Sequence, residues 1–200
     1  MIPAIVPIVE GQAEVEAVPV LLRRILEVLE AHHVEVARPF RVGRYKVVKE
    51  GELERAIQNA MKDRENVEAI LIVLDADDDC PAELGPDLAR RSRAVAAGKP
   101  SAVVLAKREL EAWFLGAKRS LRGVRGIRPD AEPPPDPEGI RGAKEALSRN
   151  MDGCRYLAVD DQPALAAEMD LGLCRTACAS FDRLVREVER LVCSMPGAKP

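Results

Sequence analysis

The chain has 200 residues, of which 47% are hydrophobic and 32% are charged, so it is long enough to bury one substantial core. Aromatic residues supply only 3%, which leaves Val, Leu, Ile and Ala to build that core and disfavours nucleic-acid recognition by rows of stacked rings. The formal net charge of −3 argues against coating nucleic acid or an acidic membrane by bulk electrostatics, but it leaves room for a local basic surface.

The first part of the chain alternates short aliphatic runs with helical patterns. Aliphatic residues from Ile5 to Val9 predict a strand, and apolar residues at helical spacing predict a helix from Glu14 to Ala31. A second strand is expected from Val34 to Phe40, and a second helix from Glu52 to Met61. Each predicted strand is therefore followed by a helix.

The strongest strand signal is the aliphatic run from Ala69 to Leu74, which stops abruptly at the acidic stretch from Asp75 to Asp79. A helix is expected from about Glu83 to Ala97, followed by another aliphatic strand from Ser101 to Ala106. Strands that alternate with helices imply right-handed crossovers and a mainly parallel sheet. The predicted fold class is therefore α/β, with a Rossmann-like central sheet flanked by helices.

The composition changes after Gly116. Residues 117–138 are rich in Arg, Gly and Pro, which predicts a loop or hinge. Helices are then expected over residues 138–151, 161–169 and 174–193. We therefore expect residues 1–116 to form an α/β core, and residues 117–200 to form a loop and a helical C-terminal extension that packs on the same domain.

Basic residues recur about every three positions in the predicted loop. They are Lys118, Arg119, Arg122, Arg125 and Arg128. The pattern has two interpretations, a solvated basic face or a local positive surface beside an acidic, metal-filled site.

The five cysteines are scattered and include no CxxC pair. Cys174 and Cys178 lie one helical turn apart, but two thiolates do not complete a tetrahedral zinc site. Reduced and mostly packed thiols are typical of a cytoplasmic protein. The apolar stretch from Met1 to Val9 is too short to span a bilayer and lacks the layout of a signal peptide, so we expect no membrane association.

Acidic residues directly follow two of the predicted strands. Glu10 follows the first strand, and Asp75 and Asp77 follow the third. Ligands of open parallel sheets bind beyond the carboxyl ends of the strands, and residues two apart in an extended segment point the same way. If the two strands are neighbours, these three carboxylates converge. A solvated turn or a helix start is the alternative for the acidic stretch alone, and it is the better interpretation of Asp78 and Asp79.

Converging carboxylates need a proton or a cation. Two like charges about 4 Å apart repel by roughly 4 kcal/mol at an effective dielectric constant near 20. Either some carboxyl groups stay protonated with raised pKa values, or a metal ion neutralises them. Oxygen ligands select Mg²⁺, Mn²⁺ or Ca²⁺ rather than zinc, and Mg²⁺ readily shares its shell with phosphate oxygens. The sequence therefore predicts Mg²⁺ (or Mn²⁺) as cofactor and phosphoryl chemistry as its use.

Further candidate residues surround this group. Glu14 lies one helical turn beyond Glu10, and it either stabilises the helix N-terminus or binds a second metal ion. Glu109 and Glu111 follow the fourth strand and are expected at the rim of the pocket. Lys107 stands at the end of that strand, where its cation would pair with a phosphate or with the carboxylates.

At these residues the sequence resembles a TOPRIM domain, the fold shared by type IA topoisomerases, bacterial primases and the overcoming-lysogenization-defect nucleases. That family places a glutamate after its first strand and an Asp-x-Asp pair after its third, as Glu10, Asp75 and Asp77 stand here. The nucleases often carry a second glutamate four positions after the first, which Glu14 matches.

More narrowly, nearly the whole chain resembles a bacterial family of TOPRIM-like proteins of unknown function. The matching segments are 9–14 (VEGQAE), 75–81 (DADDDCP) and 106–114 (AKRELEAWF), with Tyr156, Asp161-Gln162, Met169-Asp170 and Ser180-Phe181 further on. The resemblance implies a companion ATPase in a defence-type gene pair. The last motifs have no chemistry that follows from the sequence, and helix capping accounts for them equally well.

The leading prediction is a metal-dependent phosphodiesterase or nuclease that acts on DNA or RNA with water as nucleophile, because neither Tyr45 nor Tyr156 stands in a recognisable nucleophile context. The predicted catalytic residues are Glu10, Asp75, Asp77 and Lys107. The predicted metal ligands are Glu10, Glu14, Asp75, Asp77, Glu109 and Glu111.

Two alternatives stay open. A receiver-like signalling domain also gathers acids and a lysine, but it requires two adjacent acids at the first strand, where Glu10 is followed by Gly11 and Gln12. A non-catalytic module that binds an ATPase or nucleic acid is the other alternative. The chain has no GxxxxGK[ST] loop, so we do not expect it to hydrolyse nucleotides itself.

Overall fold

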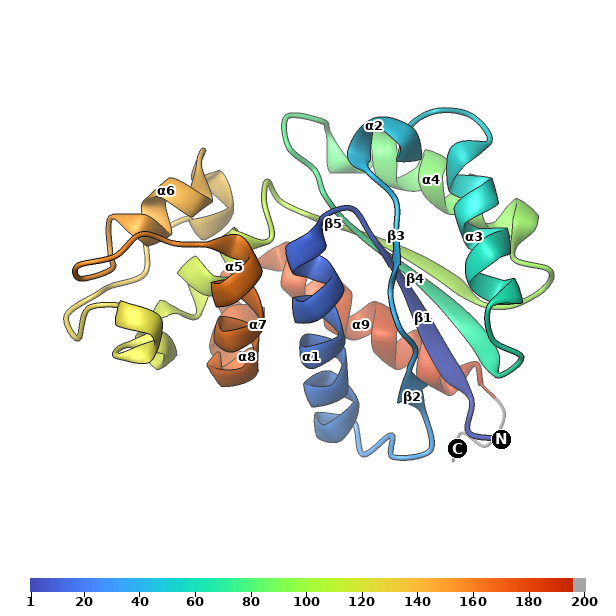
Figure 1. Cartoon of the computed structure of the whole chain (residues 1–200), viewed down its shortest axis with the longest axis horizontal. Coiled ribbons are helices and arrows are strands. Elements are labelled where there is room, and N and C mark those ends of the chain that lie inside the picture. The colour runs from blue at the N-terminus through green and yellow to red at the C-terminus, as the bar shows by residue number, and fades with distance from the viewer. Residues whose placement is uncertain (196–200) are drawn as a thin grey trace.

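The computed structural model describes residues 1–195, the side chain of Arg44 excepted, and it contains a five-stranded parallel sheet (Figure 1). The strands are β1 (Ala4–Val9), β2 (Glu35–Val36), β3 (Phe40–Arg41), β4 (Val67–Asp75) and β5 (Ser101–Ala106). The order is β2-β1-β4-β5, and β3 also pairs with β1. The predicted α/β class with a mainly parallel sheet is confirmed.

Helices cover both faces of the sheet. Helices α1 (Gln12–Val28) and α9 (Ala179–Cys193) lie on one face, and α3 (Glu52–Lys62) and α4 (Pro81–Val95) lie on the other (Figure 1). Along β4, Leu71 and Val73 belong to the hydrophobic core under α1 and α9, while Ile70 and Ile72 belong to the core under α3 and α4. Alternate residues of the strand are thus buried on opposite faces, which is why the strand is a continuous aliphatic run.

The predicted strand from Val34 to Phe40 is wrong as one element, because it is divided into β2 and β3. Pro39 separates the two parts, and proline has no N–H to donate to a sheet ladder. Both parts pair with β1, and Val42 N donates to Val9 O at 2.8 Å just beyond β3. The edge of the sheet beside β1 is therefore interrupted rather than continuous.

The C-terminal part contains more elements than the sequence predicts. Its helices before α9 are α5 (Glu111–Gly116), α6 (Ala143–Ser148), α7 (Ala158–Glu168) and α8 (Leu171–Ala177). Outside this part, the short helix α2 (Arg44–Val47) follows β3. The predicted helix 174–193 is two helices, because Cys178 has extended backbone angles of φ −127° and ψ 109°. Helix α7 packs against α1, and α9 packs against β5, so the region after residue 117 contacts the core.

The predicted loop 117–138 holds three 3₁₀ turns, Lys118–Leu121, Val124–Gly126 and Pro137–Gly139, and its basic residues have partners. Arg119 and Arg122 both pair with Glu132, and Arg125 pairs with Asp161. Lys118 is buried and donates to the carbonyl of Glu132 at 2.9 Å. These contacts neutralise the segment locally and disfavour the hypothesis of a positive surface there.

The prediction of mostly packed thiols is only partly correct. Cys174 and Cys178 are buried, whereas Cys80, Cys154 and Cys193 are exposed, and all five are free thiols. None of the described helices combines the length and the hydropathy that a bilayer crossing requires.

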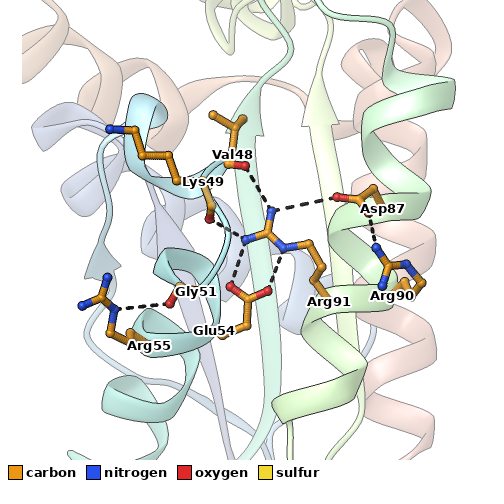
Figure 2. Close-up of polar contacts among 8 residues, drawn as sticks. All are labelled: Val48, Lys49, Gly51, Glu54, Arg55, Asp87, Arg90 and Arg91. Carbon is orange, nitrogen blue, oxygen red and sulfur yellow. Dashed lines mark hydrogen bonds and ion pairs between the residues drawn. The ribbon is translucent and has the colours of Figure 1, made fainter.

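Arg91 of α4 fixes the segment between α2 and α3 (Figure 2). Its guanidinium pairs with both carboxylate oxygens of Glu54, at 2.7 and 2.9 Å, and donates to the carbonyls of Lys49 at 2.7 Å and Val48 at 3.4 Å. Hydrogen bonding to Arg91 lowers the pKa of Glu54. Two carbonyls at the end of α2 are thereby held against α4.

We expect Arg91→Met to lower the free energy of unfolding by about 1–2 kcal/mol, because charge-assisted hydrogen bonds of a nearly buried guanidinium are lost. Arg90→Met is the matched control, since Arg90 is mostly exposed and its ion pair is with Asp87, and we expect a change below about 0.5 kcal/mol. Urea denaturation measures both changes in unfolding free energy, and equal effects of the two substitutions would contradict the structural role given to Arg91.

The pKa of Glu54 lies below its ordinary value of 4.5, so the stabilisation by the Arg91–Glu54 pair is present above that pH and is lost as the pH falls through the folded-state pKa. The difference in unfolding free energy between wild type and Arg91→Met should therefore become smaller as the pH falls through the folded-state pKa of Glu54.

Candidate functional site

The carboxyl ends of β1 and β4 bring two of the predicted acids together. The strands are direct neighbours in the sheet, with Ile8 opposite Ile72. Glu10 directly follows β1, and Asp75 is the last residue of β4. Asp75 is buried, and the backbone N–H of Leu110 donates to its Oδ1 at 2.7 Å. The two carboxylates therefore share one end of the sheet.

Asp75 is surrounded by other negative charges. Burial raises its pKa well above the ordinary value, and the charges of Glu111, Glu10 and Glu14 raise it further. The charge of Lys144 acts in the opposite direction without offsetting the rest. This group of four carboxylates, Glu10, Glu14, Asp75 and Glu111, is called the carboxylate cluster below.

Glu111 is the most buried member of the carboxylate cluster, with none of its surface exposed. Its Oε1 accepts hydrogen bonds from the Tyr156 hydroxyl at 3.0 Å and from Gln162 Nε2 at 2.9 Å. Its Oε2 accepts no hydrogen bond from the described residues but lies 3.3 Å from Lys144 Nζ. Glu111 therefore lies inside the site rather than at its rim, where the sequence places it.

Gln162 joins two members of the carboxylate cluster. Its Nε2 also approaches Glu14 Oε1 at 3.4 Å, so one amide group lies between the acids of α1 and α5. Glu14 Oε2 packs against Gly11 so closely that a Cβ on Gly11 would lie only 2.1 Å away. A side chain at Gly11 would therefore have to displace the Glu14 carboxylate from its position in the cluster.

Lys144 is the lysine whose charge acts on the cluster. Its Nζ lies 3.1 Å from Glu109 Oε2 and 3.3 Å from Glu111 Oε2. Burial lowers the pKa of Lys144, but the charges of Glu111, Asp75 and Glu109 outweigh burial, and the net pKa is raised. Lys107, the lysine predicted for this role, has an exposed side chain at the end of β5.

The remaining predicted acids differ in position. Glu109 accepts hydrogen bonds from Ala143 N at 3.1 Å and from Lys144, so its carboxylate holds the first turn of helix α6 beside the cluster. Asp77 is exposed and has a positive φ of 51°, because β4 has already ended at Asp75. The two-residue spacing of an extended strand therefore does not apply to Asp75 and Asp77. Asp78 is exposed, as expected, and pairs with Arg108 and Arg141.

Three functional candidates escaped prediction as site residues, namely Lys144, Tyr156 and Gln162. Tyr156 and Gln162 stand within the motifs that carry the family resemblance, so a signal existed without a chemical interpretation. Capping accounts for the neighbouring acids: Asp161 accepts from Leu157 N at the start of α7, and Asp170 accepts from Leu173 N at the start of α8. It does not account for Gln162, whose side chain lies in the carboxylate cluster.

The donors of the cluster fit a hard cation in kind. They are carboxylate oxygens with surplus negative charge, and Glu14 Oε2 is buried without a hydrogen-bond partner among the described residues. The described part of the chain holds no group of three His, Cys, Asp or Glu side chains already arranged around a metal position. Mg²⁺ is commonly held through only one or two carboxylates with several waters, so such a cage is not required.

An open parallel sheet with buried carboxylates at its carboxyl edge defines a Rossmann-like α/β protein with a polar site at the strand ends. More particularly, the chain belongs to the family described as "Domain of unknown function (DUF4276)", whose model matches residues 9–189.

The structure is similar to the C-terminal region of the OLD protein of Xanthomonas campestris pv. campestris. The TM-score is 0.51 at 16% sequence identity, over 94% of this chain and 95% of that one, so the likeness concerns the fold. Among curated protein sequences, none matches this chain significantly.

We expect Tyr156→Phe to lower the free energy of unfolding by about 1–2 kcal/mol, because Oε1 of the buried Glu111 loses one of its two hydrogen-bond donors and keeps only Gln162. Tyr45→Phe removes the same atom from a side chain that is 86% exposed, and it should change stability by less than about 0.5 kcal/mol. Urea denaturation of the two variants tests this pair. Indistinguishable midpoints would show that the hydroxyl does not stabilise Glu111.

Proposed function

We propose that the chain is a metal-dependent phosphodiesterase, a nuclease that cleaves DNA or RNA at the carboxyl edge of its sheet. One observation carries the proposal: four carboxylates from α1, β4, α5 and the end of β1 gather in a largely buried site, where burial and then the neighbouring negative charges raise the pKa of Asp75. Such an arrangement is costly for stability alone, and it is the kind of site in which perturbed groups serve a function. The family resemblance to TOPRIM nucleases and the OLD-like fold support the same reaction class.

Glu10, Glu14 and Asp75 are the residues that would hold Mg²⁺ or Mn²⁺, with Asp77 as a further ligand from the turn after β4. A divalent ion bound there would polarise a phosphate oxygen and lower the pKa of a water molecule. Glu111 and Glu109 are already engaged by Tyr156, Gln162 or Lys144, so they would position the cluster rather than supply its first ligands.

Lys144 would serve the phosphate. Its side chain is 42% exposed, so its ammonium faces both the buried carboxylates and the solvent from which a substrate arrives. A cation in that position stabilises negative charge that develops on a phosphoryl group. Lys107 is the alternative for this role, and its exposed side chain would act from outside the cluster.

A second candidate function is a non-catalytic module that binds nucleic acid or a partner ATPase. The hydrogen bonds and ion pairs that already engage Glu109 and Glu111 favour it, because they hold these acids in place without any catalytic role. In that case the carboxylate cluster binds a cation for structure or for partner recognition, and cleavage requires the partner.

Asp75→Asn should lower Mg²⁺-dependent cleavage of DNA or RNA by about 100-fold or more, with heat of Mg²⁺ binding lost in calorimetry. The substitution keeps an oxygen that can accept from Leu110 N and removes a charge that is costly to bury, so stability should not fall. Asp78→Asn is the matched control at an exposed aspartate, and it should leave cleavage within about threefold of wild type.

Cleavage that is unchanged in Asp75→Asn contradicts the nuclease proposal. Wild-type protein that binds Mg²⁺ through Asp75 but cleaves only when an ATPase partner is added supports the second candidate instead.

A further inference from the structure

Two adjoining hollows lie on either side of β3. Their volumes are about 510 and 370 Å³, and they share Phe40 and Arg41. Among the described residues that line them, the basic ones are Arg38, Arg41, Lys46, Arg55 and Arg64, and the acidic ones are Glu52 and Asp63. These hollows, called the β3 groove below, are locally positive in a chain whose formal net charge is −3.

The β3 groove runs beside the carboxylate cluster. Arg41 lies opposite Val9 in the sheet, and the next residue along β1 is Glu10. Gln12 lines the groove from the first turn of α1, the helix that also carries Glu14. An anion bound along the groove is therefore one strand away from the residues proposed to act on phosphate.

The cations of the groove differ in how far they are engaged. Arg55 pairs with Glu52, and Arg64 lies 3.5 Å from Glu35. Within the part of the chain that the structure describes, Arg38, Arg41 and Lys46 make no ion pair or hydrogen bond through their side chains. These three charges are available to a ligand, unlike those of Lys118 to Arg128.

A second basic hollow provides a comparison. It is lined by Arg93, Lys99, Arg183 and Arg190 near Ser101, at the start of β5. Two of its cations are engaged, since Lys99 pairs with Glu68 and Arg190 with Glu187. Its lining residues on β5 are Ser101 to Val103, three to five residues from Ala106, the partner of Asp75, which is roughly 10–16 Å. Charge alone does not separate the two hollows, whereas position relative to the cluster does.

One wall of the β3 groove is held in place, and the residue that precedes its Lys46 in sequence is an exposed tyrosine that lines neither hollow. Lys46 lies on α2, whose end is fixed to α4 through the contacts of Arg91 with Val48 and Lys49 (Figure 2). Tyr45, the neighbour of Lys46, is 86% exposed. An exposed ring beside cations is the combination that binds unpaired bases and their phosphates.

We propose that the β3 groove binds the backbone of a single nucleic-acid strand through Arg38, Arg41 and Lys46, stacks an unpaired base on Tyr45, and delivers the adjoining phosphate to the carboxylate cluster. This inference rests on the proposed nuclease function for its purpose, but binding itself requires neither metal nor cleavage. The partner is a nucleic acid with unpaired bases, because the bases of an intact duplex are stacked on one another and offer no free face to the ring of Tyr45.

The test is the binding of a fluorescein-labelled single-stranded 20-nucleotide DNA in EDTA, measured by anisotropy. Arg41→Glu combined with Lys46→Glu should weaken binding at least tenfold and reduce the slope of log K against log salt by about one to one and a half, because two phosphate contacts are lost. Arg93→Glu combined with Arg183→Glu is the matched control: it makes the same change in net charge at exposed residues of the other hollow, and it should weaken binding less than threefold.

Tyr45→Ala should weaken single-stranded binding about five- to tenfold and leave binding of the corresponding duplex within twofold. Equal losses in the two double variants, no loss in the groove variant, or no binding by wild type would overturn the proposal. A Tyr45→Ala variant that weakens both DNA forms equally would overturn the assignment to a single strand.

The outcomes separate this inference from the nuclease proposal. Asp75→Asn should bind the 20-nucleotide strand in EDTA as wild type does, although it no longer cleaves. Loss of binding in the groove variant without cleavage by any form supports the groove and contradicts the nuclease function. If the Arg41→Glu, Lys46→Glu variant binds as wild type does and Asp75→Asn loses cleavage, the proposed role of the β3 groove is contradicted and the nuclease function is supported.

Discussion

The burial of like charges at one end of the sheet is the constraint on which the rest of the site depends. Burial raises the pKa of Asp75, and the negative charges of Glu111, Glu10 and Glu14 raise it further. The groups placed around them answer that repulsion: a lysine ammonium, a tyrosine hydroxyl and a glutamine amide all direct positive or donor ends toward Glu111. Three such groups act on Glu111, whereas Oδ1 of Asp75 accepts from the backbone N–H of Leu110.

This distribution makes the C-terminal region part of the site. Lys144, Tyr156 and Gln162 all lie beyond residue 117, and they reach the cluster because α7 packs on α1 while α6 begins beside Glu109. The hydrogen bond of Gln162 to Glu111, with its longer approach to Glu14, joins α7 to two helices of the core. The extension therefore shapes the electrostatics of the strand ends, as well as covering the sheet.

The sequence allowed prediction of features that depend on local pattern and failed where tertiary contacts decide. The strands β1, β4 and β5 follow from uninterrupted aliphatic runs, and Glu10 and Asp75 follow from the places where two of those runs stop. The pairing of Asp77 with Asp75 does not follow, because the backbone turns into a positive φ directly after the strand. Lys144 was not predictable from spacing, since it lies 33 positions and three 3₁₀ turns beyond Glu111. Pro39 and Cys178 interrupt elements whose apolar pattern continues across them.

The net charge of the chain is a poor guide to its ligands because the charges are segregated. Arginines of residues 117–138 pair with Glu132 and Asp161, whereas carboxylates gather at the strand ends. The net charge of the whole chain reveals neither of these local arrangements. A polyanion approaching the cluster would meet repulsion unless cations line its path. Arg38, Arg41 and Lys46 supply such cations on the β1 edge, where Pro39 breaks the sheet and leaves the backbone hollowed on both sides. The same interruption that shortens β2 and β3 thus leaves a positive groove one strand away from the buried acids, on which a negatively charged polymer would lie close to them.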